Sequence, residues 1–208
     1  MVFVCSIGKK NRFAIVIRQQ IFIIAGCNGA GKTSAVNTWL PQWFEIRPFI
    51  NADEIARGLS PFQSDAKAVE AGRIMLNEMQ DYLSQCKSFS FETTLATRSF
   101  SNMITDAQRN GYQVNMLFLW LSDVSVAKDR VRNRVKEGGH FIDEKTIERR
   151  YHRGLQNLFE RYLPLLDQLV VVDNSLGFDH IIAFQHAHGD LKIVNAEKWN
   201  KMAAYERG

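Results

Sequence analysis

Apolar residues occur in short runs along this chain, and stretches with helical periodicity separate the runs. Three runs are apolar at nearly every position: residues 21–24, 114–121 and 169–172. Continuous apolar runs of this length are typical of parallel strands that are covered on both faces. Shorter runs at 48–50 and 88–91 predict two further strands. The pattern therefore predicts a three-layer α/β fold with a mostly parallel central sheet.

Between these strands, apolar residues recur every three or four positions, as on one face of a helix. The longest such segment runs from about Ser64 to Cys86, and its expected core face is Val69, Gly72, Leu76, Met79, Leu83 and Cys86. A later helix begins near Asp143, and its expected core face is Ile147, Tyr151, Leu155, Leu158 and Tyr162. After the last parallel strand, apolar residues on both sides of Gly189-Asp190 predict a C-terminal β-hairpin.

The run at 21–24 leads into Gly26-Cys27-Asn28-Gly29-Ala30-Gly31-Lys32-Thr33, and Ser34 continues into a predicted helix that stops at Pro41. This is the motif G-x-x-x-x-G-K-[ST], a phosphate-binding loop in its required position between a strand and a helix. Its glycines let successive backbone N–H groups surround phosphate oxygens. We therefore expect residues 26–34 to bind ATP, with Lys32 on the β- and γ-phosphates and Thr33 on Mg²⁺.

Three acidic residues follow predicted strands, at the sheet edge where α/β folds gather their ligands. Asp53 follows the strand at 48–50 and is placed either to cap a helix or to accept a proton from an acceptor hydroxyl. Glu92 follows the strand at 88–91 and either ends that strand, polarises the water shell of Mg²⁺ or binds substrate. Asp123 also follows a strand, but the helix that begins directly after it favours a helix cap.

Net positive charge is concentrated in one segment. Between Lys128 and Arg161 there are ten Lys and Arg residues against six Asp and Glu, which accounts for the whole formal charge of +4. Two predicted helices in this segment carry arginines and are joined by Gly138-Gly139. The pattern favours a helical lid over about 128–161 that supplies cationic donors to a phosphoryl group. For any single arginine, a solvated helical hairpin is the alternative.

The remaining features limit the function classes. No apolar stretch approaches the roughly 18 residues of a membrane span, and no secretory signal is recognisable. Three cysteines without pair spacing predict a cytoplasmic setting. No DNA or RNA motif is present, so we expect neither a nucleic-acid nor a membrane partner. Residues 1–18 are predicted to be an extension or an edge strand, and 19–208 a single P-loop kinase domain.

Between about Ile21 and Ser175 the chain resembles the zeta toxin family of P-loop kinases. The phosphate loop is shared by many unrelated NTPases, but two further segments are more specific: Asn51-Ala52-Asp53-Glu54-Ile55 and Ser90-Phe91-Glu92-Thr93-Thr94-Leu95. The resemblance implies ATP-dependent transfer of a phosphoryl group to a small-molecule hydroxyl, that of a nucleotide sugar such as UDP-N-acetylglucosamine. It also implies an antitoxin protein as a partner.

The resemblance further implies roles for individual residues. Asp53 would be the base for the acceptor hydroxyl, Glu92 and Thr94 would hold the acceptor, and a lid arginine, Arg134, would stabilise the transition state. The family carries a second lid arginine. Here the nearest alignment puts His140 at that position, with Arg149 or Arg150 displaced along the next helix.

Two other functions stay open at this point. One is a P-loop kinase for a different acceptor, such as an antibiotic or nucleoside hydroxyl. The other is a slow NTPase switch that acts through a protein partner. Asp53 and Glu92 argue against the switch, because a switch needs no base for an acceptor.

Overall fold

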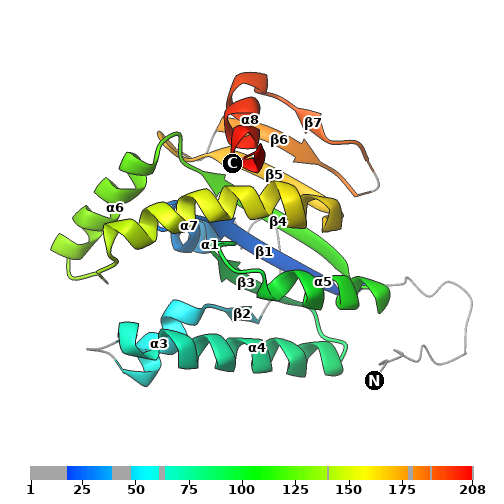
Figure 1. The fold of residues 1–208 in the computed structure, drawn as a ribbon. Coiled ribbons are helices and arrows are strands. Elements are labelled where there is room, and N and C mark those ends of the chain that lie inside the picture. Colours follow the sequence, from blue (N-terminus) through cyan, green and yellow to red (C-terminus); the bar gives the residue numbers. More distant parts are fainter. Residues whose placement is uncertain are drawn as a thin grey trace, which may run out of the picture.

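A computed structural model describes residues 18–38, 48–60, 64–139, 141–177, 180–187 and 189–207. Within these residues, seven strands form one sheet in the order β2-β3-β1-β4-β5-β6-β7 (Figure 1). Residues 1–17, for which the sequence predicts an extension, lie outside the described part of the chain, and so do His140 and the predicted helix end at Pro41.

The sheet is parallel over most of its width. Its strands are β1 (Gln20–Gly26), β2 (Phe49–Ile50), β3 (Phe89–Thr93), β4 (Gln113–Trp120), β5 (Gln168–Asp173), β6 (His180–Gln185) and β7 (Lys192–Ile193). Strands β1 to β5 pair in parallel, whereas β6 and β7 add to β5 as an antiparallel hairpin. The predicted α/β class and the C-terminal hairpin are confirmed.

Helices lie along the sheet and at its β2 edge. They are α1 (Lys32–Thr38), α3 (Ala52–Leu59), α4 (Ala68–Ser84), α5 (Ser99–Arg109), α6 (Val124–Lys136), α7 (Glu144–Asn157) and α8 (Ala196–Ala203). A π-helical turn, η2 (Leu158–Tyr162), continues α7, and 3₁₀ turns occur at η1 (Ser64–Lys67), η3 (Leu163–Leu165) and η4 (Ala204–Arg207). Figure 1 shows α7 crossing the sheet, α3 and α4 beside β2, and α8 beside β6.

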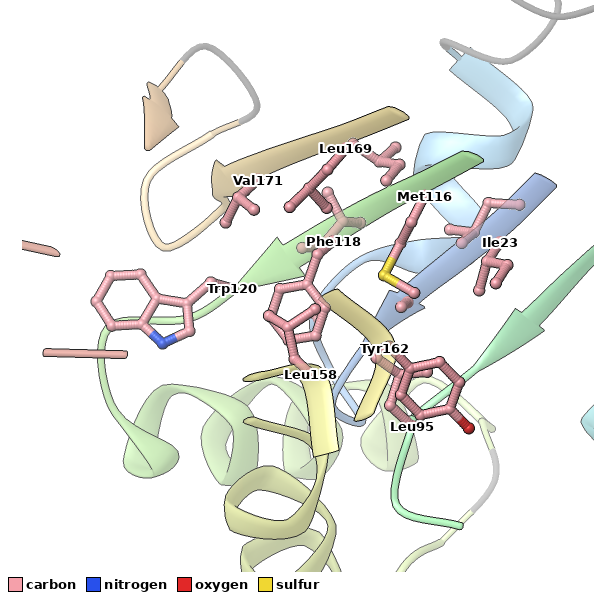
Figure 2. Packing of buried hydrophobic residues seen from close by; sticks show 14 of the residues in the cluster. Ile23, Leu95, Met116, Phe118, Trp120, Leu158, Tyr162, Leu169 and Val171 are labelled. Carbon is pink, nitrogen blue, oxygen red and sulfur yellow. The ribbon is translucent and has the colours of Figure 1, made fainter. Parts of the chain in front are cut away.

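The core lies between the sheet and its helices, and Figure 2 shows part of it. The predicted core face of the later helix is confirmed, because all five of its residues are buried on α7 and η2: Ile147, Tyr151, Leu155, Leu158 and Tyr162. The predicted cap at Asp123 is also confirmed, since its carboxylate accepts a 2.8 Å hydrogen bond from the Ser125 backbone N–H. Among the described helices, none is both long enough and apolar enough to cross a membrane.

The predicted core face of α4 is wrong in part. Met79 is buried and Leu76 and Leu83 are partly buried against the core, as expected. Val69, however, is 71% exposed, and the other fully buried residues of the helix are Ala71 and Met75. The buried positions therefore recur at four-residue steps, Ala71, Met75 and Met79, and the face is rotated from the expected one. Helix α4 packs against α3 as well as the core, and Gly72 lines the cavity described below.

Candidate active site

The phosphate-binding loop links β1 to α1 and depends on glycine at three positions. Gly26, Gly29 and Gly31 have positive φ angles of 148°, 78° and 86°, which side chains with a Cβ disfavour. A Cβ at Gly26 would lie 2.4 Å from the Leu119 carbonyl oxygen on β4. The loop is thus fitted closely against the neighbouring strand, and its curved backbone is a consequence of these glycines.

Glu92, at the end of β3, contacts both functional side chains of the loop. Its Oε1 lies 3.6 Å from Lys32 Nζ, and its Oε2 accepts a 3.3 Å hydrogen bond from the Thr33 hydroxyl. Lys32 Nζ also donates to the Cys27 carbonyl at 3.0 Å. Both charged side chains are more than nine-tenths buried. These contacts arise because β3 pairs directly with β1, which brings Glu92 beside Ile24.

Asn51 also lines the cavity and contacts Glu92, which the sequence analysis did not predict. Its Oδ1 accepts a 2.8 Å hydrogen bond from the Asp53 backbone N–H, so Asn51 is the N-cap of α3. Its Nδ2 donates to Glu92 Oε2 at 3.0 Å. Asp53 is therefore not the helix cap, which was one of its two expected roles, and its exposed carboxylate lies in the first turn of α3. The signal available in the sequence was an Asn between a strand and an acidic helix start.

A cavity of about 660 Å³ brings half of the fourteen predicted site residues together. Seven of them line it: Asn28, Lys32, Asp53, Glu92, Thr94, Arg134 and Arg150. The other predicted loop residues, including Thr33, are not in its lining. The lining also includes small or apolar residues, namely Ala52, Ala56, Ala68, Gly72, Met75 and Phe100, and the exposed Phe141. The cavity size suits a small organic ligand.

Two of the predicted lid arginines reach this cavity, from different helices. Arg134 lies in the last turn of α6 and is exposed, and Arg150 lies on α7 and is half-buried. Arg150 Nη1 donates a 3.1 Å hydrogen bond to Asn28 Oδ1 in the phosphate loop. Arg149 is exposed on α7 and is not in the lining.

Two other basic residues on α6 are engaged elsewhere. Arg130 donates to three backbone carbonyls, those of Gly29 at 3.4 Å, Asn174 at 2.7 Å and Ser175 at 3.0 Å. It therefore joins the phosphate loop to the segment after β5. Arg132 pairs with Glu144 at 3.0 Å, which links α6 to α7 at the surface.

The thiol of Cys27 lies inside the phosphate loop and is buried. Burial raises its pKa from an ordinary 9.0 to about 11, although nearby Lys32 and Arg130 oppose the shift. The thiol is therefore neutral at physiological pH and is a poor nucleophile.

The site offers oxygen ligands for a magnesium ion but not a complete coordination shell from the protein. Among the described residues, no cluster of three or more His, Cys, Asp or Glu side chains could hold a metal. The Thr33 hydroxyl and the Glu92 carboxylate lie together at the phosphate loop. This set fits Mg²⁺, which prefers oxygen ligands and completes its shell with water and substrate phosphates.

Comparison with known proteins identifies the family. Residues 45–177 match the family model described as Zeta toxin, a stretch that is more than half of the chain. The chain belongs to the zeta toxin family. The matched stretch contains Asp53, Glu92, Arg134 and Arg150 and begins after the phosphate loop. An uncharacterized protein of Haemophilus influenzae is 29% identical over 136 residues, which are 65% of this chain and 95% of that protein.

Solved structures share the fold of this zeta toxin family member. The AvrRxo1-ORF1:AvrRxo1-ORF2 complex with sulphate ions matches with a TM-score of 0.73 and 16% identity, over 91% of this chain and 65% of that one. The chain thus spans about two thirds of that structure. The PezAT toxin–antitoxin system of Streptococcus pneumoniae matches with a TM-score of 0.61 and 13% identity, over 96% of this chain and 89% of that one. Together with the family, this fold supports a P-loop kinase-like phosphotransferase.

Proposed function

We propose that this protein transfers the γ-phosphoryl group of ATP to a hydroxyl of a small molecule, with a nucleotide sugar such as UDP-N-acetylglucosamine as the first acceptor to test. The observation that carries the proposal is the single cavity that Lys32, Asp53, Glu92, Arg134 and Arg150 line. A nucleotide switch needs the phosphate loop alone. A kinase needs, in addition, a carboxylate and cationic donors across from that loop.

At the donor end, the residues of the loop would hold the nucleotide. Backbone N–H groups and the Lys32 ammonium would donate to phosphate oxygens, while Thr33 and Glu92 would hold Mg²⁺. When bound, Mg²⁺ neutralises charge on the phosphates. The contacts of Glu92 with Lys32 and Thr33 favour this metal-side role over direct binding of the acceptor. Thr94, which also lines the cavity, is then the better candidate for acceptor binding.

At the acceptor end, Asp53 would act as the general base. It takes the proton of the acceptor hydroxyl while the acceptor oxygen bonds to the γ-phosphorus and the bond between that phosphorus and the β–γ bridging oxygen breaks. Arg134 and Arg150 would donate to the oxygens of the transferring group. Positioning and charge stabilisation of this kind supply most of the rate in phosphoryl transfer.

The proposal also includes a cellular setting and a protein partner. ATP is a cytoplasmic metabolite, in keeping with the predicted cytoplasmic setting. The PezAT neighbour is a toxin–antitoxin system, and family membership supports an antitoxin protein as a partner of this chain too.

The test compares two substitutions on the same turn of α3. Asp53→Asn is expected to retain ATP binding and to lose at least about 100-fold in transfer. Glu54→Gln is the control on the same turn, because Glu54 is exposed and is not in the cavity lining, although its ion-pair partner Arg57 is. Transfer is measured with UDP-N-acetylglucosamine, and by mass spectrometry of a cell extract incubated with protein and ATP, as a metabolite heavier by one phosphate.

Other outcomes point elsewhere. A phosphorylated antibiotic or nucleoside would replace the nucleotide sugar as acceptor. ADP formation without any phosphorylated product would favour the slow NTPase switch. Near-wild-type transfer by Asp53→Asn would contradict the role of Asp53 as base.

A further inference from the structure

Leu95 follows the cavity residues Thr93 and Thr94 and has an unusual backbone conformation. Its φ angle is +55°, in the left-handed region, and its side chain is completely buried. Such a conformation costs a leucine about 1 kcal/mol or more and persists only where surrounding contacts impose it. Its backbone N–H donates to the Thr93 hydroxyl at 3.0 Å. This local hydrogen bond satisfies the N–H of Leu95, whereas its carbonyl bonds to another element.

The other contacts come from α7 and its π-helical extension. Asn157, which is 5% exposed, donates from Nδ2 to the Leu95 carbonyl at 2.6 Å. Tyr162 donates its hydroxyl to the Thr97 carbonyl at 3.2 Å. Burial raises the Tyr162 pKa to about 12, so this hydroxyl keeps its proton. Figure 2 shows Leu95 and Tyr162 in the same part of the core.

Gly154 completes this set of contacts because it has no side chain. A Cβ at this position would lie 2.6 Å from the Thr94 carbonyl oxygen, closer than a real Cβ contact allows. The helix can therefore approach the Thr94 backbone only with glycine here. We refer to Gly154, Asn157 and Tyr162 as the α7 clamp.

The same helix also contacts the phosphate loop. Arg150 precedes Gly154 by four residues and donates to Asn28, and Asn157 follows Gly154 by three. Residues at these spacings share one face of a helix. One face of α7 thus contacts the phosphate loop at one point and the Thr94–Leu95 backbone at another.

We propose that the α7 clamp positions Thr94 for the acceptor and sets its distance from the phosphate loop. Asn157 and Gly154 are positioning residues, because they contact the Thr94–Leu95 backbone and do not line the cavity. This inference rests on the proposed function for its acceptor, but the clamp itself can be tested without any substrate. Within the predicted lid, α7 is then the fixed part that joins the two ends of the site.

The first experiment removes the hydrogen bond of Asn157. In Asn157→Ala, hydrogen exchange of the 93–97 backbone, measured by mass spectrometry, is expected to rise about tenfold or more. The KM for UDP-N-acetylglucosamine should rise about tenfold while the Kd for ATP stays within about twofold. Asn115→Ala is the matched control, since Asn115 is a buried asparagine on β4 with its own hydrogen bond to Gln20 and is not in the cavity lining.

The second experiment displaces Thr94 without removing a hydrogen bond. Gly154→Ala is favourable for helix propensity, by about 1 kcal/mol, yet its Cβ must push the Thr94 backbone away. The same rise in KM is expected, with the Arg150 contact to the loop retained. In the control, Gly58→Ala on α3, the added Cβ meets no atom within 4 Å, and no change in KM should follow.

The α7 clamp and the choice of acceptor are tested by separate outcomes. Unchanged exchange of residues 93–97 in Asn157→Ala would overturn the clamp. The clamp would also be overturned if Asn115→Ala raised the KM as much as Asn157→Ala does, because the rise in KM would then reflect lost stability alone. A wild-type protein that leaves UDP-N-acetylglucosamine unmodified would overturn that acceptor, and the exchange measurement would then decide the clamp by itself.

Discussion

Asn51 and Glu92 form a hydrogen bond of 3.0 Å between the start of α3 and the end of β3. The same asparagine caps α3 through its side-chain oxygen. Glu92 in turn contacts Lys32 and Thr33. One side chain therefore connects the helix that carries Asp53 to the carboxylate beside the phosphate loop, so the separation of the proposed base from the donor end depends on Asn51.

The two functions of Asn51 can be separated by substitution. Asn51→Ser should keep the cap and lose the bond to Glu92, at a cost of about 1–2 kcal/mol in the free energy of unfolding. Asn51→Ala should lose both and cost about 2–4 kcal/mol. Urea denaturation measures both values. Equal costs for the two variants would show that the cap contributes nothing.

Arg130 is expected to support the fold of the phosphate loop and to take no part in transfer. Arg130→Ala leaves three backbone carbonyls without their charged donor, which should lower the free energy of unfolding by about 2 kcal/mol or more. Arg132 lies two residues along the same helix. Arg132→Ala loses only surface ion pairs and should change the free energy of unfolding little. Thermal denaturation of the two variants checks this, and a similar Tm for both would contradict the role given to Arg130.

Gly72 offers a way to fill the cavity without disturbing the fold. A Cβ at Gly72 would meet no atom of the described residues within 4 Å, and the residue lines the cavity. Gly72→Leu should therefore raise the acceptor KM at least about tenfold with ATP affinity unchanged, while the helix gains up to about 1 kcal/mol. Gly58→Leu, which also enters open space but lies outside the lining, is the control. An unaltered KM in Gly72→Leu would place the acceptor elsewhere.

Cys27 predicts a specific dependence on pH. Because its pKa is raised from 9.0 to about 11 in the folded protein, the unfolded chain loses this proton first as pH rises. The contribution of the thiol to stability is thus complete below pH 9 and is lost between pH 9 and about pH 11. Urea denaturation across this range should show a decline that is smaller in Cys27→Ala. Alkylation of Cys27 by iodoacetamide should be slow at neutral pH, and labelling at the rate of the unfolded chain would contradict the shift.

Much of this architecture was predictable from local patterns. Continuous apolar runs identified the parallel strands, and the phosphate loop follows from its glycines and Lys32. The core face of α7 also follows from periodicity, because its buried residues Ile147, Tyr151 and Leu155 recur at four-residue steps. Helix α4 differs, since it contacts both α3 and the core, and its Gly72 lines the cavity.

The connections between side chains were not predictable in the same way. Asn51 and Glu92 are 41 residues apart, and Arg150 and Asn28 are 122 apart. Whether such residues meet depends on strand order and on helix placement, neither of which periodicity specifies. The same holds for the arginines, because sequence spacing alone does not distinguish Arg130, which binds backbone carbonyls, from Arg134, which lines the cavity.

The antiparallel end of the sheet offers a practical attachment point. Strands β6 and β7 lie beyond β5, and of the residues after Arg150 that the structure describes, none lines the cavity. Because β6 runs antiparallel to β5, it ends at the edge of the sheet opposite the phosphate loop, so the exposed Gly189-Asp190 turn lies away from both proposed binding ends. An affinity handle introduced at this turn would immobilise the protein with the cavity left open to solvent, and a fluorophore there would report on it. Many candidate acceptors could then be screened in an array.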